Sequence, residues 1–170
     1  GIPSISLDKE NCYNNPEYTS KSDKLVSLTK EMNKKLKGSI TYKFGKQVVV
    51  LDKNTYSSWL KTKKDYSGYK VDKNAMENWL LKFMYKYNTQ YGWHKFKTHD
   101  GRTKKIYGGP YGWRISKDKE MASVKKMLKE GTTETREPYW REKAKVYDGV
   151  NGDIGDTYVE VDMGAQTVYY

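Results

Sequence analysis

The fold depends on a stretch that runs from Asp72 to Tyr87 and reads DKNAMENWLLKFMYKY. Its apolar side chains recur at intervals of three and four residues, at Met76, Trp79, Leu80, Phe83, Met84 and Tyr87. That spacing predicts an amphipathic α-helix with a broad apolar stripe along one side. Because a wide stripe contacts several neighbours, we expect this helix to lie at the centre of the fold.

Further helices are predicted before and after the central one. The first follows Ser22, a residue type common at helix N-termini, and ends at Gly38. A short helix covers Asn54–Leu60, and the last one follows Ser116 and ends at Gly131. The apolar positions expected to face the core are Leu25, Leu28, Met32, Leu36, Trp59, Met121, Val124 and Leu128.

Short strands and turn residues occupy the segments between the helices. Residues 39–44 and 47–51 flank a Gly-Lys turn and predict a β-hairpin, and residues 93–107 predict another around an Asp-Gly turn. Further extended segments are predicted over residues 132–150, 157–162 and 167–170, the last two paired with each other. The mixture predicts an α+β fold with three main helices packed against antiparallel hairpins around a small single core.

The composition indicates a globular but very polar chain with a strong positive charge. Only 36% of its 170 residues are hydrophobic, but 16 Tyr and 5 Trp supply large side chains that can still form a core. The 32 Lys and Arg against 21 Asp and Glu give a formal net charge of +11, which favours polyanionic partners such as nucleic acid, anionic lipid or a cell-wall polymer. Scattered lysines are equally expected of a solubilising surface, so charge alone does not choose among these partners.

The sequence offers no catalytic constellation. Its one cysteine, Cys12, excludes an intramolecular disulfide framework and lies in a loose N-terminal stretch without a nearby histidine. His94 and His99 lack a third metal ligand, and no pair of carboxylates stands out as acid and base. We therefore predict that this chain is not an enzyme and holds no cofactor or metal.

A glycine-rich aromatic segment, residues 107–114, is the first candidate for ligand binding. It lacks the Gly-Lys-Ser/Thr ending of a phosphate-binding loop. In an extended segment, Tyr111 and Trp113 would project on the same side beside Arg114 and could stack on a sugar ring or a peptide. The alternative is a structural turn that carries two core aromatic residues, since three glycines and Pro110 favour a bend.

Basic and aromatic residues also interleave in the hairpin that precedes this segment, over residues 93–97. Such interleaving suits stacking on unpaired bases, but it is equally expected of any surface rich in Tyr and Lys. The complete set of candidate ligand-binding residues is Trp93, His94, Tyr107, Tyr111, Trp113 and Arg114.

A family resemblance rests on residues 107–115, YGGPYGWRI, followed by a Lys- and Glu-rich helix, Gly131 and Arg136-Glu137-Pro138. This pattern resembles the peptidoglycan-binding, VanW-associated domain that precedes the catalytic module of many L,D-transpeptidases. Residues 154–162 are similar to the junction that leads into the transpeptidase domain. The resemblance covers roughly residues 22–170, including segments similar to the family's helix-to-strand passage, short Trp-containing helix and central helix, at residues 36–44, 55–60 and 72–87.

The resemblance implies three parts: a loose lead-in over residues 1–21, a peptidoglycan-binding domain over 22–152, and the junction and first strands of a truncated catalytic domain over 153–170. The family's catalytic domain carries a His and a Ser-His-Gly-Cys-type motif whose Cys is the nucleophile, and nothing in this sequence matches that motif. Acyl-transfer chemistry is thus implied for the parent protein and not for this chain.

The resemblance also implies a location at the cell-wall face of a Gram-positive-type bacterium. The wall offers anionic partners there, in stem-peptide carboxylates and teichoic-acid phosphates. No run of about 18 apolar residues predicts a membrane span within the chain. The chain opens with Gly1 rather than Met, so we expect a segment cut from a longer protein with a membrane anchor upstream.

Three functions stay open on this evidence. The first is a non-catalytic domain that binds peptidoglycan or positions a transpeptidase module near it. The second is an architectural spacer without a ligand, and the third is a nucleic-acid-binding module, for which the sequence has no helix-turn-helix, RNP-type or zinc motif. Exposed strand edges over residues 157–170 also predict self-association with a second chain.

Overall fold

The apolar stripe of residues 72–87 forms helix α3, Lys73–Tyr87, in the computed structural model, which describes residues 17–149 and 151–170. The helix begins where the Asp72 side chain accepts a 3.0 Å hydrogen bond from the Ala75 backbone N–H. Its side chains Met76, Leu80 and Phe83 are buried. The expected central position of this helix is therefore confirmed.

A three-stranded sheet lies against α3. Strand β1, Ser39–Phe44, is its middle strand and pairs in antiparallel register with β2, Gln47–Leu51, as the sequence predicted. On its other side β1 pairs with β8, Thr133–Arg136, and this pairing is parallel. The sequence predicted an extended segment here without a pairing partner, and the structure adds the parallel pairing with β1. Because β8 follows a helix rather than a tight turn, the chain returns across the sheet and enters it in the same direction as β1.

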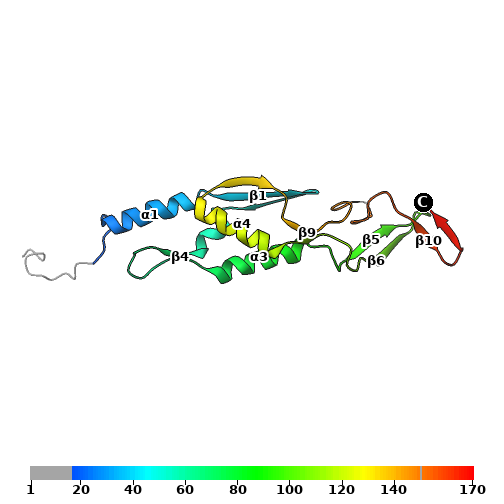
Figure 1. Ribbon diagram of the computed structural model, residues 1–170, viewed down its shortest axis with the longest axis horizontal. Helices are drawn as coiled ribbons and strands as arrows, with labels where there is room; N and C mark the ends of the chain where they lie inside the picture. Colours follow the sequence, from blue (N-terminus) through cyan, green and yellow to red (C-terminus); the bar gives the residue numbers. More distant parts are fainter. Residues whose placement is uncertain (1–16, 150) are drawn as a thin grey trace, which may run out of the picture.

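Helix α4, Lys117–Glu130, packs beside α3, and the two helices lie on the same side of the sheet (Figure 1). Both helices and the inner face of β1 contribute to a single hydrophobic core. Its buried members are Ile40, Tyr42, Phe44, Leu51, Tyr56, Trp59, Met76, Leu80, Phe83, Tyr87, Ile115, Val124, Met127 and Leu128. This agrees with the predicted α+β class and single core.

The whole molecule is elongated (Figure 1). Helix α1, Asp23–Lys35, lies at one end and contributes one buried side chain, Leu28. The opposite end carries two hairpins, β5 (Trp93–Lys97) with β6 (Thr103–Tyr107) and β10 (Glu160–Asp162) with β11 (Thr167–Tyr169). The smaller elements are α2 (Lys53–Tyr56), the 3-10 turn η1 (Ser57–Trp59), β3 (Leu60–Thr62), β4 (Tyr69–Val71), β7 (Arg114–Ile115) and β9 (Trp140–Glu142).

Helices α1 and α4 begin where the sequence predicted, but their first turns are not capped by the serine side chains. Ser22 and Ser116 do precede α1 and α4, but neither side chain makes a capping hydrogen bond within its helix. Helix α1 ends at Lys35, before Gly38, whereas α4 ends as predicted at Gly131 in the left-handed conformation, with φ of 70°. Cys12 and residues 1–16 of the expected lead-in lie outside the described residues.

A buried ion pair joins α4 to the sheet. The Glu120 carboxylate has no exposed surface and accepts two hydrogen bonds from the Arg136 guanidinium, of 2.8 and 2.9 Å. The Tyr42 hydroxyl donates a third, of 3.0 Å, and the Tyr139 backbone N–H a fourth. Burial and the Glu120 charge raise the pKa of Tyr42, which keeps that hydroxyl protonated as a donor.

Replacing Glu120 by Ala is expected to lower the free energy of unfolding by about 3 kcal/mol or more, because it leaves the Arg136 charge half-buried without its main partner. Urea denaturation followed by circular dichroism measures the change. The matched control is Glu134→Gln, since Glu134 also accepts from Arg136, at 2.9 Å, but is 40% exposed. An equal loss of stability in the two variants would contradict the central role of Glu120.

Replacing Gly131 by Ala is expected to cost about 1–3 kcal/mol of stability, because a side chain is strained at positive φ. A Cβ atom there would also lie 2.8 Å from the Lys34 carbonyl oxygen at the end of α1. Gly68→Ala serves as the control, since its nearest neighbour would be the flexible Lys63 side chain at 3.8 Å. Thermal melting of both variants checks the difference, and equal midpoints would refute it.

Candidate binding surface

The β5–β6 hairpin has two faces of opposite character. Cross-strand register places Trp93 opposite Tyr107, with the other pairs continuing along the strands. Because side chains alternate between faces, every second residue shares the face of Trp93. We call this the aromatic–lysine face; its six residues, all exposed, are Trp93, Lys95, Lys97, Thr103, Lys105 and Tyr107.

The aromatic end of this face is formed by two rings that are open to solvent. Trp93 is 62% exposed and Tyr107 is 55% exposed, although both are large apolar side chains. Their ring centroids lie 5.5 Å apart with an angle of 52° between the planes. The Lys105 ammonium lies 5.2 Å from the Trp93 ring centroid, within range of a cation–π interaction.

Backbone hydrogen bonds hold the loops at this end of the hairpin. The Gly108 N–H donates to the Gly92 carbonyl at 2.9 Å, which continues the ladder beyond the last strand pair. The Tyr91 N–H donates to the Gly109 carbonyl at 2.7 Å, and Tyr91 is itself 58% exposed. The two rings of the face are therefore carried on ordered strands rather than on free loops.

The other face of the hairpin is covered by the C-terminal segment. Phe96 is buried and packs edge-on against the Tyr158 ring, with centroids 4.9 Å apart. Asn151 Oδ1 accepts a 3.1 Å hydrogen bond from the Lys97 backbone N–H. Near the hairpin tip, His99 Nδ1 lies 3.0 Å from Glu160 Oε1 and its ring stacks on Tyr169. Residues 151–170 therefore form the support on which the hairpin rests.

His94 belongs to this covered face and not to the aromatic–lysine face. Its side chain is 12% exposed, and Nε2 lies 3.8 Å from Asp153 Oδ2, beyond hydrogen-bonding distance. Within the described residues this nitrogen has no hydrogen-bond partner. Gly108 allows the close approach, because a Cβ atom there would lie 2.7 Å from the ring. The position suits a residue that supports the hairpin from beneath.

Asp153 connects this support to the glycine-rich segment. Burial raises the pKa of its carboxyl, against a hydrogen bond donated by the Thr89 hydroxyl. The Tyr111 hydroxyl donates to the Asp153 carbonyl at 3.3 Å and accepts from the Lys145 N–H at 3.0 Å. Tyr111 is 45% exposed, so it is anchored at its hydroxyl and open elsewhere.

The glycine-rich segment turns and is not extended. The Tyr111 N–H donates back to the Gly108 carbonyl at 3.1 Å, and Gly109 has φ of 54°. Of the two geometries that the sequence left open for this segment, the structure therefore has the turn favoured by the glycines and Pro110, and not the extended one. Trp113 is half-buried, donates from Nε1 to the Val146 carbonyl at 2.7 Å, and packs against Trp140.

The six predicted site residues thus fall into separate places. Trp93 and Tyr107 meet on the aromatic–lysine face, whereas His94 lies beneath it. Tyr111 and Trp113 are tied to the segment after β9, and Arg114 is half-buried in β7, where it pairs in register with Glu142. The lysines of the face were not singled out from the sequence, although the period of two over residues 93–97 and 103–107 indicates them.

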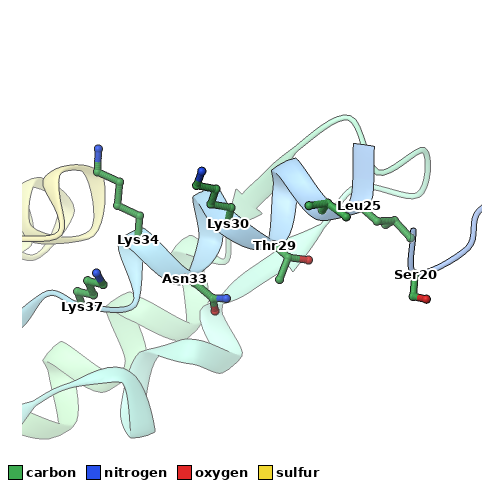
Figure 2. A pocket seen from close by; sticks show the side chains of 8 residues that line it. Ser20, Leu25, Thr29, Lys30, Asn33, Lys34 and Lys37 are labelled. Atoms are coloured by element: carbon green, nitrogen blue, oxygen red, sulfur yellow. The ribbon is translucent and has the colours of Figure 1, made fainter. Parts of the chain in front are cut away.

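A large hollow lies elsewhere, along α1 (Figure 2). It has a volume of about 820 Å³, and its described lining comes from α1 and the residues just before and after it. Lys30, Lys34 and Lys37 line it together with the apolar Leu25 and Val26. Its described lining holds no histidine, cysteine or carboxylate.

The described residues contain no cluster of three or more His, Cys, Asp or Glu side chains that could hold a metal ion. Over the same ranges, no helix has the length and apolar character needed to cross a membrane. The aromatic–lysine face can instead offer ring faces for stacking and ammonium groups for anions.

Comparison with known proteins places this chain near cell-wall enzymes. Residues 18–136 match the family described as "Putative peptidoglycan binding domain". The fold is similar to that of the Ldtfm–avibactam carbamoyl enzyme, with 25% identity and a TM-score of 0.60, over 82% of this chain and 53% of that chain. It is also similar to a mutant of the Enterococcus faecium L,D-transpeptidase, with 26% identity and a TM-score of 0.58, over 81% and 54%.

This chain therefore spans about half the length of those two solved chains. A search of curated proteins gives no match. The family model covers well over half of the sequence, including all six predicted site residues, and it confirms the resemblance drawn from residues 107–115. The chain belongs to the peptidoglycan-binding domain family.

Proposed function

We propose that this chain is a non-catalytic domain that binds peptidoglycan and positions the catalytic module of an L,D-transpeptidase against it. The observation that carries the proposal is the aromatic–lysine face, an exposed surface of stacking and cationic groups on a chain of the peptidoglycan-binding family. Trp93 and Tyr107 are its principal contacts.

The physical chemistry of the face suits a wall polymer. Exposed aromatic rings bind the apolar faces of sugars, and lysines attract carboxylates and phosphates over several ångströms. Strand pairing orders the backbone that carries both rings, so little backbone entropy is lost when a ligand covers them.

The position of the face supports a role in placement. Residues 153–170, which resemble the junction into a catalytic module, lie beneath the hairpin, and the Tyr158 hydroxyl donates to the Lys97 carbonyl at 3.3 Å. A polymer bound on the aromatic–lysine face would then be held at a fixed distance from residues 153–170 on the opposite face, and so from a catalytic module that continues from them. In this proposal residues 22–152 are the binding domain, residues 153–170 begin the catalytic domain, and the parent protein is anchored outside a Gram-positive-type cell.

A second candidate is an architectural spacer that binds nothing. It is favoured by the contacts of Tyr111 and Trp113, whose polar atoms are used within the chain. Such a spacer would hold the catalytic module away from the membrane through its elongated shape (Figure 1).

The purified domain is expected to sediment with isolated cell walls at low salt. The double variant Trp93→Ala, Tyr107→Ala should lose at least about tenfold in affinity, as is typical when central aromatic contacts are removed. Tyr85→Ala is the control, because Tyr85 is an aromatic residue that is 92% exposed and belongs to α3 and not to the hairpin. Failure of the unaltered chain to sediment would overturn the proposal in favour of the spacer.

The Trp113→Ala variant is expected to be destabilised by about 2–3 kcal/mol, since it removes a half-buried indole from a packed aromatic cluster. Wall binding per folded molecule should stay unchanged. Melting curves and sedimentation of the same sample separate the two effects. The opposite pattern, intact stability with lost binding, would move the binding site to the glycine-rich segment.

A further inference from the structure

We infer that the ligand of the aromatic–lysine face is a stretch of peptidoglycan glycan from which the stem peptides have been removed, and not the stem peptide itself, because only peptide-free muramic acid carries a free lactyl carboxylate. In this assignment a sugar ring stacks on Trp93 and Tyr107, and the carboxylate carried by that sugar or its neighbour pairs with Lys95 and Lys105. The inference rests on the proposed function and goes one step further, because it names the part of the polymer that is recognised.

The shape of the aromatic end favours sugar rings. The Trp93 and Tyr107 rings are each more than half exposed, and their centroids are 5.5 Å apart, comparable to the length of one sugar residue in an extended chain. Peptides in extended form are usually recognised by strand edges and by pockets for alternate side chains. The face presents open ring surfaces, which match the apolar face of a pyranose.

The charge next to the rings favours an acidic ligand. Lys95 and Lys105 are directly opposite each other on the two strands, and Lys97 follows on the same face. Like charges in this arrangement repel, so the free face carries a cost that an anion between the lysines would relieve. The six residues of the face include no acid to do so.

The nearest acid along the hairpin is committed to its turn. Asp100 accepts hydrogen bonds from the Thr98 hydroxyl, at 2.6 Å, and from the Arg102 backbone, at 3.2 Å. These bonds, the Thr98 one first, lower the pKa of Asp100 to about 2. Its charge is therefore already paired with the turn and with the Arg102 guanidinium.

The aromatic rings and the lysine ammonium groups of the face are separated by a short, defined distance. Lys105 is two residues before Tyr107 on β6, and its ammonium already lies over the Trp93 ring. A ligand stacked on the rings would therefore meet the ammonium groups of Lys105 and Lys95 within roughly one residue pair along the strands, about 7 Å. An acidic group attached to the stacked sugar, or to the next one, satisfies this distance, whereas a neutral glycan satisfies only the stacking.

The chain itself offers a matched control for the lysines. Lys61 and Lys70 also lie directly opposite each other, on β3 and β4, and both are exposed. The paired residues of β3 and β4 include no pair of aromatic residues beside these lysines. If the positive charge of the molecule alone were sufficient for ligand binding, removal of this second lysine pair would lower the affinity as much as removal of the first.

Calorimetric titration of the full chain tests the inference with three probes: peptide-free glycan strands with free lactyl carboxylates, neutral chitin oligosaccharides of similar length, and the isolated stem peptide. The glycan strands should bind best, chitin oligosaccharides about fivefold more weakly, and the stem peptide below detection. The variant Lys95→Ala, Lys105→Ala should lose about fivefold on the acidic glycan alone, and raising the salt to screen the charges should remove that difference.

The variant Trp93→Ala, Tyr107→Ala should lose at least about tenfold on both glycans, and Lys61→Ala, Lys70→Ala should leave all affinities unchanged. Circular dichroism establishes that each variant is folded. Binding of the stem peptide in preference to the glycan, or equal losses from the two lysine pairs, would overturn the inference while wall sedimentation still stood. Loss of sedimentation itself would instead refute the proposed function.

Discussion

The buried carboxylate of Glu120 is the constraint around which the central domain is arranged. A charge without solvent must be matched by donors in good geometry, because an unpaired one costs several kcal/mol. Its donors come from three different elements: Tyr42 on β1, Arg136 on β8, and the Tyr139 backbone just before β9. The network therefore fixes the one parallel strand pairing of the described sheet, which short-range turn chemistry could not specify.

The candidate binding surface is connected to this core through the end of α3. Asn88 Oδ1 accepts a 2.8 Å hydrogen bond from the Ile115 N–H, and the Thr89 hydroxyl oxygen accepts one of 2.8 Å from the Trp113 N–H. The Tyr147 hydroxyl donates to the Tyr87 carbonyl at 2.8 Å. The last residue of α3 and the two residues after it thus bind Trp113, Ile115 and the segment after β9. These bonds therefore fix the orientation of the β5–β6 hairpin relative to α3.

Sequence periodicity was enough for the helices and for the three hairpins over residues 39–51, 93–107 and 160–169, because each is decided by neighbours within a few positions. It could not reveal the role of Glu120, which looks like one more surface acid in a Lys- and Glu-rich helix. Its burial follows from a partner sixteen residues later, Arg136, and from Tyr42 on another strand. Long-range pairing of this kind leaves no local pattern.

The candidate site also shows what sequence patterns alone cannot predict. His94 is next to Trp93 in sequence but lies on the opposite face of the strand, because side chains alternate. Because the chain bends at Gly108–Gly109, Trp113 contacts Trp140. It does not lie beside Tyr111, as it would in an extended segment. Alternation could have been applied to the hairpin once its register was known. The glycines and Pro110 indicated that the segment could bend, but the partners that hold the Tyr111 hydroxyl, Asp153 and Lys145, lie far along the chain and leave no local pattern.

An open, shallow face has a consequence for how such a domain would work on a polymer. Two half-exposed rings and a few surface ammonium groups bury little area, and exposed ion pairs contribute little each, so a single contact is weak and short-lived. Under the proposed function, the bound polymer would repeat the same sugar many times, and a tethered parent protein would keep the domain close to it. The high effective concentration of binding sites would then compensate for the low affinity of a single contact. Weak contact would also suit the proposed function, since a domain that released slowly would hold a catalytic module at one position on the polymer.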